Sequence, residues 1–485
     1  MADNATLLET GPRGPGLGGK RRDGARELPE RLALLFPETA TGAAGRQRAA
    51  RVAVQFALVC AGAAALLLRV GGIPAWDVTY AEDNGVFLVD GLVRPWHLLV
   101  PYNGYLELGP RLIGQVIASF LPIADVSAAY AVTGALISAA SGLFLYHASA
   151  GYARARWARA LLGGALVLLP VAPLEIIDSG VNSPWYVLAA LFFAVLWRPR
   201  SRAGMLAAAL VACYASSSEI IAFTYAPLLL IRLIALPRVR EHAVTAGWLL
   251  GLLLQLPVVA LSYAQHKQRR GALSTPGQAM AFYCHNVVLR ALGWHLSVWL
   301  KAAAGYNGAT VIVGAALALA AGWAFVAGDR QVRLFATLAL VTGFAQVAFE
   351  ATVAQGTIFQ PPTPSFMAAA RYSTVPVVLI AATGIVAVDS HVRRRPLPGE
   401  GPVPGARAAA LPGVRPLVAV GLLACVLGFG WVTDFRYASQ RSHAGHWLPY
   451  AQDLVAACTR HPAGDVTLNA WGGHQFTVPC TRIRR

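Results

Sequence analysis

The stretch VAVQFALVCAGAAALLLRVGG, from Val52 to Gly72, decides the fold class. It is apolar over about 20 residues, the length that an α-helix needs to cross the hydrocarbon core of a bilayer. The rest of the chain agrees, because 56% of its 485 residues are hydrophobic and only 13% are charged, whereas soluble domains carry about 25% charged residues. We therefore expect an all-α, polytopic transmembrane helical bundle.

Further apolar runs predict about eleven spans by the same rule of about 20 residues. The expected spans lie near 52–71, 127–148, 159–174, 184–198, 203–217, 219–236, 243–263, 309–328, 334–353, 373–389 and 416–433. Several are shorter than the rule requires, and the pair at 203–236 is separated only by SSSE.

The loops between these runs predict the orientation. Arginine concentrates in YARARWAR, RPRSR, PRVREH, GDRQVR and HVRRRPLPGEGPVPGAR, and basic loops stay on the cytoplasmic side. This places the N-terminus inside and the tail 434–485 outside a bacterial plasma membrane, with the transmembrane domain at 52–433. Residues 1–51, rich in Gly, Arg and Pro, are expected to be a disordered cytoplasmic tail. The net charge of +17 is spread among apolar runs, which excludes a nucleic-acid partner and favours membrane lipid.

The first outside loop, 72–126, is long and acidic. It contains TYAEDNGVFLVDGL (79–92), where Glu82 and Asp83 are adjacent. Acids at an apolar boundary are costly unless they are used; surface charge or a helix cap is the alternative. PRLIGQVIASFLP (110–122) is too short to span and is expected to be an interfacial helix. A later outside loop, 264–308, departs from the charge rule, because it carries five Lys and Arg residues and no acid.

The stretch EDNGVFLVDGLVRPWHLLVPYNGYLELGPRL (82–112) resembles integral-membrane glycosyltransferases of the GT-C class. It is most similar to a bacterial subgroup with an ED-G-x-VF element followed by PY-x-GY-L-x-L-x-PRL. The resemblance implies a many-helix membrane fold, a catalytic acid in a long first outer loop, and a polyprenyl-phosphate sugar donor. It assigns the catalytic position to Asp83, with Glu82 beside it. This chain has Asn84 where the resemblance leads us to expect glycine, and Glu107 where we expect histidine.

The chemistry of such a transfer defines the other candidates. A base must take the proton of the acceptor hydroxyl, and cations must hold the leaving phosphate, for which arginine is suited. The candidate phosphate ligands are Arg111, Arg371, Arg269 and Arg270, and Tyr102 and Tyr105 offer flat faces for a sugar or isoprenoid. A snorkelling Arg111, an interfacial aromatic belt, and lipid headgroups meeting the cations of loop 264–308 are the alternatives.

A second constellation, LEIIDSGVNSPWYVL (174–188), follows the third apolar run. Asp178 and Asn182 could bind saccharide or glycolipid acceptor hydroxyls, or a divalent cation such as Mg²⁺ or Mn²⁺, although nothing in the spacing requires a metal. Asn182 and Ser183 could instead only cap the helix that Pro184 begins. Glu219, at the end of SSSE, is the weakest candidate.

Cys458 and Cys480 stand in the tail. If the tail lies outside, the compartment permits a disulfide; two unrelated thiols are the alternative. The chain lacks GxxxxGK[ST], HExxH and GxSxG motifs, which excludes a P-loop ATPase of the usual kind. The resemblance to the GT-C class implies a membrane glycosyltransferase, which we expect to be of inverting type. A transporter or flippase for a lipid-linked saccharide, or an inactive scaffold for envelope assembly, is the alternative.

Overall fold

The computed structural model describes residues 32–37, 47–80, 82–170, 176–264, 274–354, 370–394, 416–436, 445–469 and 475–483. Helices dominate this part of the chain. The longer ones are α2 (Gln47–Leu67), α4 (Leu108–Phe120), α5 (Val126–Ala148), α6 (Arg156–Val167), α8 (Ser183–Leu196), α9 (Arg202–Ser218), α10 (Ala226–Ala235), α11 (Ala243–Ala264), α13 (Trp294–Ala327), α14 (Arg330–Phe349), α15 (Thr374–Arg394), α16 (Pro416–Thr433) and α17 (Trp447–Arg460). The two described strands, β1 (Asp465–Asn469) and β2 (Gln475–Pro479), form one antiparallel hairpin.

The helices confirm an all-α bundle with membrane character. Six described segments are long and apolar enough to cross a bilayer: Ala50–Leu67, Ile123–Gly151, Val239–Ala264, Trp294–Val326, Arg330–Thr352 and Ala370–Arg393. Three shorter apolar helices lie at Ser183–Leu196, Ile220–Ala235 and Val418–Thr433. A helix occupies most of each expected range, but the expected number of eleven crossings stays a prediction, as does the orientation.

Helix α8 is the centre of the bundle. All fourteen of its residues are buried, because SPWYVLAALFFAVL is apolar on every face and α5, α9 and α15 pack around it. A helix that is hydrophobic all round belongs inside a core. Its first turn therefore projects from the centre of the bundle toward the loops at one end, where the candidate site lies.

Small residues bring α9 and α11 together. Gly247 and Gly251 are four positions apart, in the small-xxx-small spacing that lets membrane helices approach closely. A Cβ atom added to Gly247 would lie 2.1 Å from the Ala209 carbonyl oxygen, and one added to Gly251 would lie 2.6 Å from the Cys213 carbonyl oxygen. Side chains at these positions would force the two helices apart.

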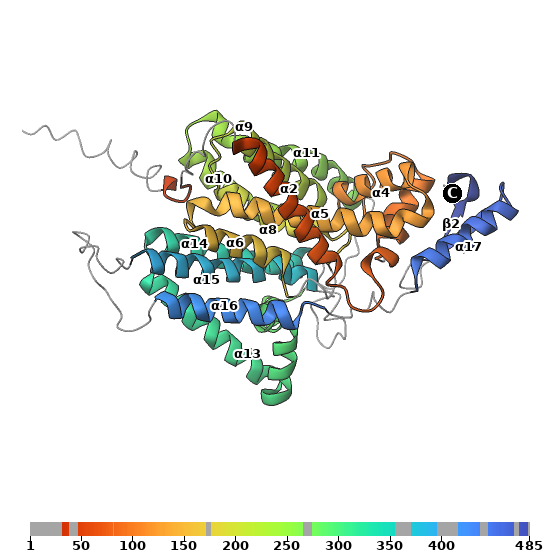
Figure 1. The fold of residues 1–485 in the computed structure, drawn as a ribbon. Coiled ribbons are helices and arrows are strands. Elements are labelled where there is room, and N and C mark those ends of the chain that lie inside the picture. Colours follow the sequence, from red (N-terminus) through yellow and green to blue (C-terminus); the bar gives the residue numbers. More distant parts are fainter. Residues whose placement is uncertain are drawn as a thin grey trace, which may run out of the picture.

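The loop 72–126, between α2 and α5, folds into short helices that lie against the bundle. Helix α4 has the expected short length, and it exposes Leu112, Val116 and Phe120 at intervals of four residues. Such an apolar stripe fits a helix lying along a membrane surface. Figure 1 shows α4 in orange at the same end of the bundle as α17 and β2 in blue.

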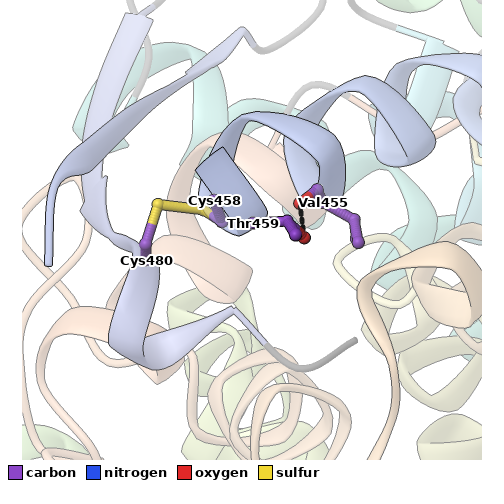
Figure 2. The surroundings of a disulfide bond; sticks show 4 residues. All are labelled: Val455, Cys458, Thr459 and Cys480. Carbon is purple, nitrogen blue, oxygen red and sulfur yellow. Dashed lines mark hydrogen bonds between the residues drawn. A yellow bond between two sulfur atoms is a disulfide. The ribbon is translucent and has the colours of Figure 1, made fainter. Parts of the chain in front are cut away.

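The C-terminal tail forms a small unit that packs on this loop. The Trp447 indole donates a hydrogen bond to the Ile123 carbonyl, and the Leu448 amide donates to the Asp77 carboxylate. A disulfide joins Cys458 on α17 to Cys480 directly after β2, as Figure 2 shows. The β-hairpin is an addition to the all-α expectation, and residues 470–474 between its strands lie outside the described part.

Two contacts tie distant segments together elsewhere. The Asp434 carboxylate, just after α16, accepts hydrogen bonds from the amides of Trp294 and His295 and thereby caps the start of α13. At the other end of the chain, Leu35 and Phe36 are buried, and Tyr152 donates a hydrogen bond to the Leu35 carbonyl. The disorder expected for residues 1–51 therefore does not extend to 32–37, because LALLF supplies apolar side chains that the bundle can bury.

Removing the disulfide should loosen the C-terminal unit. Replacing Cys458 and Cys480 together with serine opens a link across 22 positions, and we expect a loss of about 3 kcal/mol of local stability. Hydrogen exchange of the α17 amides measures this loss. Cys425→Ser, at an exposed cysteine on α16, is the control and should change nothing. Equal exchange of α17 in the double variant and the parent would contradict the prediction.

Candidate functional site

Asp83 begins the π-helix η2 (Asp83–Leu88), and Glu82 directly precedes it. The two side chains have different surroundings. Glu82 lines a pocket, whereas Asp83 is 1% exposed and accepts a hydrogen bond from the Val181 amide at 2.8 Å. Gly180 makes this approach possible, since a Cβ atom there would lie 2.8 Å from the Tyr130 ring. Asp83 therefore holds the 176–182 segment, and Glu82 is the acid that faces the pocket. π-Helical turns of this kind are frequent at functional sites.

The sequence YNGY forms the next wall of the pocket. Tyr102 and Tyr105 exchange backbone hydrogen bonds of 2.8 and 3.1 Å. Asn103 and Gly104 both have positive φ values, 51° and 92°, as a two-residue hairpin turn of type I′ requires. The tight turn places Tyr102 and Tyr105 at the same pocket.

Residues from distant parts of the chain complete the pocket. The pocket is narrow, with a cavity volume of about 20 Å³. The lining residues are Glu82, Tyr102, Asn103, Tyr105, Glu107, Val181, Asn182, Trp185, Glu219, Glu350, Arg371 and Tyr372. Four of these side chains are carboxylic acids, and one is an arginine. The pocket therefore carries an excess of acidic groups unless protons or a bound cation offset it.

Arg371 forms a long ion pair with Glu82 in the pocket. It lies in the short helix η11 (Ala370–Ser373), and its Nη1 is 3.9 Å from Glu82 Oε1. The guanidinium also lies 5.4 Å from the centre of the Tyr372 ring, and that ring meets Trp185 edge-on. Each of the two charged side chains is 21% exposed. The pair is thus open on one side, and a phosphate could reach the guanidinium.

The Glu107 carboxyl, directly before α4, has a strongly shifted pKa. Burial is the main cause that raises the pKa of its carboxyl, to about 8, and the charge of Glu82 raises it further. A hydrogen bond with Tyr105 and the charge of Arg371 oppose this rise. Its Oε2 is buried and accepts no hydrogen bond from the described residues. At neutral pH Glu107 is therefore mainly a neutral acid that can donate a hydrogen bond.

The raised pKa of Glu107 predicts a pH-dependent stability. Between the ordinary value of 4.5 and the folded value of about 8, the folded chain keeps a proton that the unfolded chain has released. Stability should therefore fall as the pH rises through this window. We expect Glu107→Gln to flatten the decline in unfolding temperature from pH 5 to 9. Asp453→Asn, at an exposed acid on α17, is the control. If the unfolding temperature of Glu107→Gln declined with pH as steeply as that of the parent, the proton responsible would belong to another group.

Arg111 and Asp178 do not line this pocket. Arg111 is buried and forms a 2.7 Å ion pair with Asp90, with its guanidinium 5.5 Å from the centre of the Phe87 ring. Asp178 is 1% exposed and lies close enough to the buried Arg69 to interact with its charge. Both residues hold the surrounding loops in place.

Asn182 does line the pocket, and it precedes α8 as the N-cap residue. Its side chain makes no capping hydrogen bond, but it contacts the Ser179 hydroxyl at 3.4 Å. The remaining expected phosphate ligands, Arg269 and Arg270, lie outside the described residues.

A second pocket adjoins the first through Tyr102, which lines both. Its walls are mostly apolar, with a charged group formed by Asp90, Arg94 and Arg111. Phe476 of β2 closes one side, so the C-terminal unit contributes directly. The cavity volume here is about 270 Å³, so this pocket is the wider of the two.

Glu107 and Glu350 are pocket residues that sequence reasoning did not select, and Glu219 was its weakest candidate. Glu219 ends α9, and Glu350 begins the π-helix η9 (Glu350–Ala354). A usable signal existed for Glu350, because it is an acid within an apolar run. Glu107 was noticed only as a departure from the expected histidine.

Within the described ranges, no three His, Cys, Asp or Glu side chains come together in an arrangement that could hold a metal ion. No protein-family model, no curated protein and no solved structure matches the chain.

Proposed function

We propose that the chain is a membrane glycosyltransferase, moving a sugar from a polyprenyl-phosphate donor to a saccharide or glycolipid acceptor at the outer face of a bacterial plasma membrane. The observation that carries the proposal is the pair formed by Glu82 and Arg371, 3.9 Å apart in a tyrosine-lined pocket. A base and a phosphate-binding cation in one pocket are what such a transfer needs. The pocket lies at one end of a bundle that can hold a lipid tail beside it.

The proposed step is a single displacement. The acceptor hydroxyl oxygen attacks the anomeric carbon of the donor sugar, and Glu82 takes the hydroxyl proton. The bond from the anomeric carbon to the phosphate oxygen breaks, and the phosphate leaves with the electron pair, held by Arg371. One displacement inverts the anomeric centre. Glu107, neutral at pH 7, donates a hydrogen bond to the sugar.

The roles of the two adjacent acids differ here from the sequence-based expectation. Asp83 was expected to be the base, with Glu82 as a helper. We assign the base to Glu82, because it lines the pocket and its Oε2 accepts no hydrogen bond from the described residues. We assign to Asp83 a positioning role, since it holds the Val181 amide.

The second pocket is the place we propose for the acceptor. It touches the first pocket at Tyr102, and its aromatic and apolar walls suit the apolar face of a sugar ring or the tail of a glycolipid. Asp90 and Arg94 can bind hydroxyl groups at its edge. An acceptor lying there would reach the donor past the Tyr102 ring.

A direct assay tests the proposal. Purified protein is incubated with radiolabelled polyprenyl-phosphate sugars and candidate acceptors, and product formation is measured. Turnover that disappears in Glu82→Gln supports the transferase. If no donor gave turnover and the protein moved a lipid-linked saccharide across a vesicle membrane, the chain would be a transporter and not a transferase.

One observation favours that second function. Glu107, Glu219 and Glu350 are all buried and all line the first pocket. Buried carboxyls along a path through a membrane are typical of proton-coupled transport. A transporter would move saccharide at a rate that depends on the proton gradient, whereas a transferase would form product without any gradient. If neither activity is found, an inactive scaffold for envelope assembly is the remaining alternative.

A further inference from the structure

A cluster of cations lies in an acid-free part of the chain. Between Glu241 and Asp329 the sequence contains no acidic residue, although it contains Lys267, Arg269, Arg270, Arg290 and Lys301. The structure describes Arg290 and Lys301 and brings them close to His285. None of these three residues lines either of the pockets described above.

The break in α13 shapes the cluster. Gly305 has φ 69°, a left-handed conformation that interrupts the helix, and Lys301 and Tyr306 lie on either side of it. The Lys301 ammonium is 4.5 Å from the centre of the Tyr306 ring. The His285 ring stacks on Tyr306 with centres 4.2 Å apart, and His285 Nδ1 is 3.0 Å from the Thr310 hydroxyl. Residues of η7 and of α13 on both sides of its break thus meet around one tyrosine ring.

The charges in this cluster repel one another. Arg290 is 1% exposed and is the charge that acts most strongly on Lys301, and Lys301 is the charge that acts most strongly on His285. Asp434 is the acid held near the start of α13, and it is engaged by the amides of Trp294 and His295. Arg290 is buried and Lys301 is partly exposed, so water screens the repulsion between these two like charges only in part. A bound anion would remove that cost.

The surface beside the cluster indicates which kind of molecule would supply the anion. Val298 and Trp299 precede the break in α13, and Val311 and Ile312 follow it; these side chains are 45%, 65%, 69% and 51% exposed. A cationic group bordered by exposed apolar side chains on a membrane helix matches a phosphate headgroup with acyl chains. A small soluble anion would gain no binding energy from the exposed apolar side chains beside the cluster.

We propose that His285, Arg290, Lys301 and Tyr306 bind the phosphate headgroup of an anionic membrane phospholipid. The π-helix η7 (Tyr283–Val288), which carries His285, packs against η11, which carries Arg371. A lipid bound here therefore braces the wall of the first pocket without entering it. The site is separate from the proposed donor site and does not depend on sugar transfer.

Lipid-dependent stabilisation of the full chain tests this site. The chain is purified in detergent, and its unfolding temperature is titrated with phosphatidylglycerol, with phosphatidylcholine and with inorganic phosphate. We expect phosphatidylglycerol to stabilise the parent most, and Lys301→Gln to weaken its apparent affinity about fivefold. Without lipid, Lys301→Gln should be as stable as the parent or more so, because a repulsion with Arg290 is removed. A purely structural lysine would not give these opposite effects.

The controls separate the possible sources of phosphate. Arg460→Gln, at an exposed cation on α17, should bind phosphatidylglycerol like the parent, and Lys301→Arg should retain most of the affinity. Equal stabilisation by phosphatidylcholine, or an unchanged affinity in Lys301→Gln, would overturn the proposal. So would protection by inorganic phosphate alone. A raised KM for the sugar donor in Lys301→Gln, with phospholipid binding unchanged, would instead assign the cluster to the donor.

Discussion

Replacing Glu82 with glutamine should reduce sugar transfer by about 10²–10⁴-fold while leaving the fold intact. The substitution keeps the shape of the side chain but removes the basic oxygen that takes the acceptor proton. The ion pair that it breaks is long, 3.9 Å, and partly exposed, so its loss should cost less than about 1 kcal/mol of stability. Initial rates with a labelled donor measure the effect. The unfolding temperatures of the parent and the variant are measured as well, to show that both are folded.

Asp83→Asn is the matched comparison. An asparagine oxygen can still accept the hydrogen bond from the Val181 amide, so we expect the segment 176–182 to stay in place and most of the activity to survive. The opposite pattern, with an inactive Asp83→Asn and an active Glu82→Gln, would return the base to Asp83. Retained activity in both variants and in the double variant would show that neither carboxylate takes the proton.

Replacing Arg371 with glutamine should lower kcat by about 10²–10³-fold, as expected when a charged group that holds a leaving oxyanion is removed. Arg371→Lys should lie between the parent and the glutamine variant, because lysine keeps the charge but cannot bind two phosphate oxygens in one plane. Arg202→Gln, at an exposed arginine at the start of α9, is the control.

The pH profile gives Arg371 a second test. Its charge lowers the pKa of Glu107, so Arg371→Gln should raise that pKa, and the fall in stability that Glu107 causes should continue to higher pH. An unchanged pH range of this fall would mean that Arg371 does not act on the pocket acids. A normal kcat would remove Arg371 from phosphate binding.

The helices were predictable because their cause is local. Apolar runs such as Ser183–Leu196 form helices wherever they leave water, and YNGY contains the residue types that its turn requires. The side that each acid faces was not predictable in this way. Glu82 and Asp83 are adjacent, and only the π-helical turn at η2 decides which of them lines the pocket.

The partners of the charged residues depend on contacts that no local pattern contains. Arg111 was expected at a phosphate, but Asp90 lies 2.7 Å away and pairs with it. Glu219 and Glu350 reach the pocket from helices that are distant in sequence. The sequence identifies arginine and glutamate as candidate site residues, but only the packed bundle shows which of them lie at the pocket.

The cap that Asp434 places on α13 sets an order of events during biosynthesis. Trp294 precedes Asp434 by 140 positions, and a ribosome adds about 5–20 residues per second. The start of α13 therefore waits about 7–28 seconds for its capping carboxylate after it has been made. During that interval the membrane insertion machinery, and not Asp434, must shield the free amides of this helix. A chain truncated before Asp434 should consequently be a preferred substrate for membrane quality-control proteases.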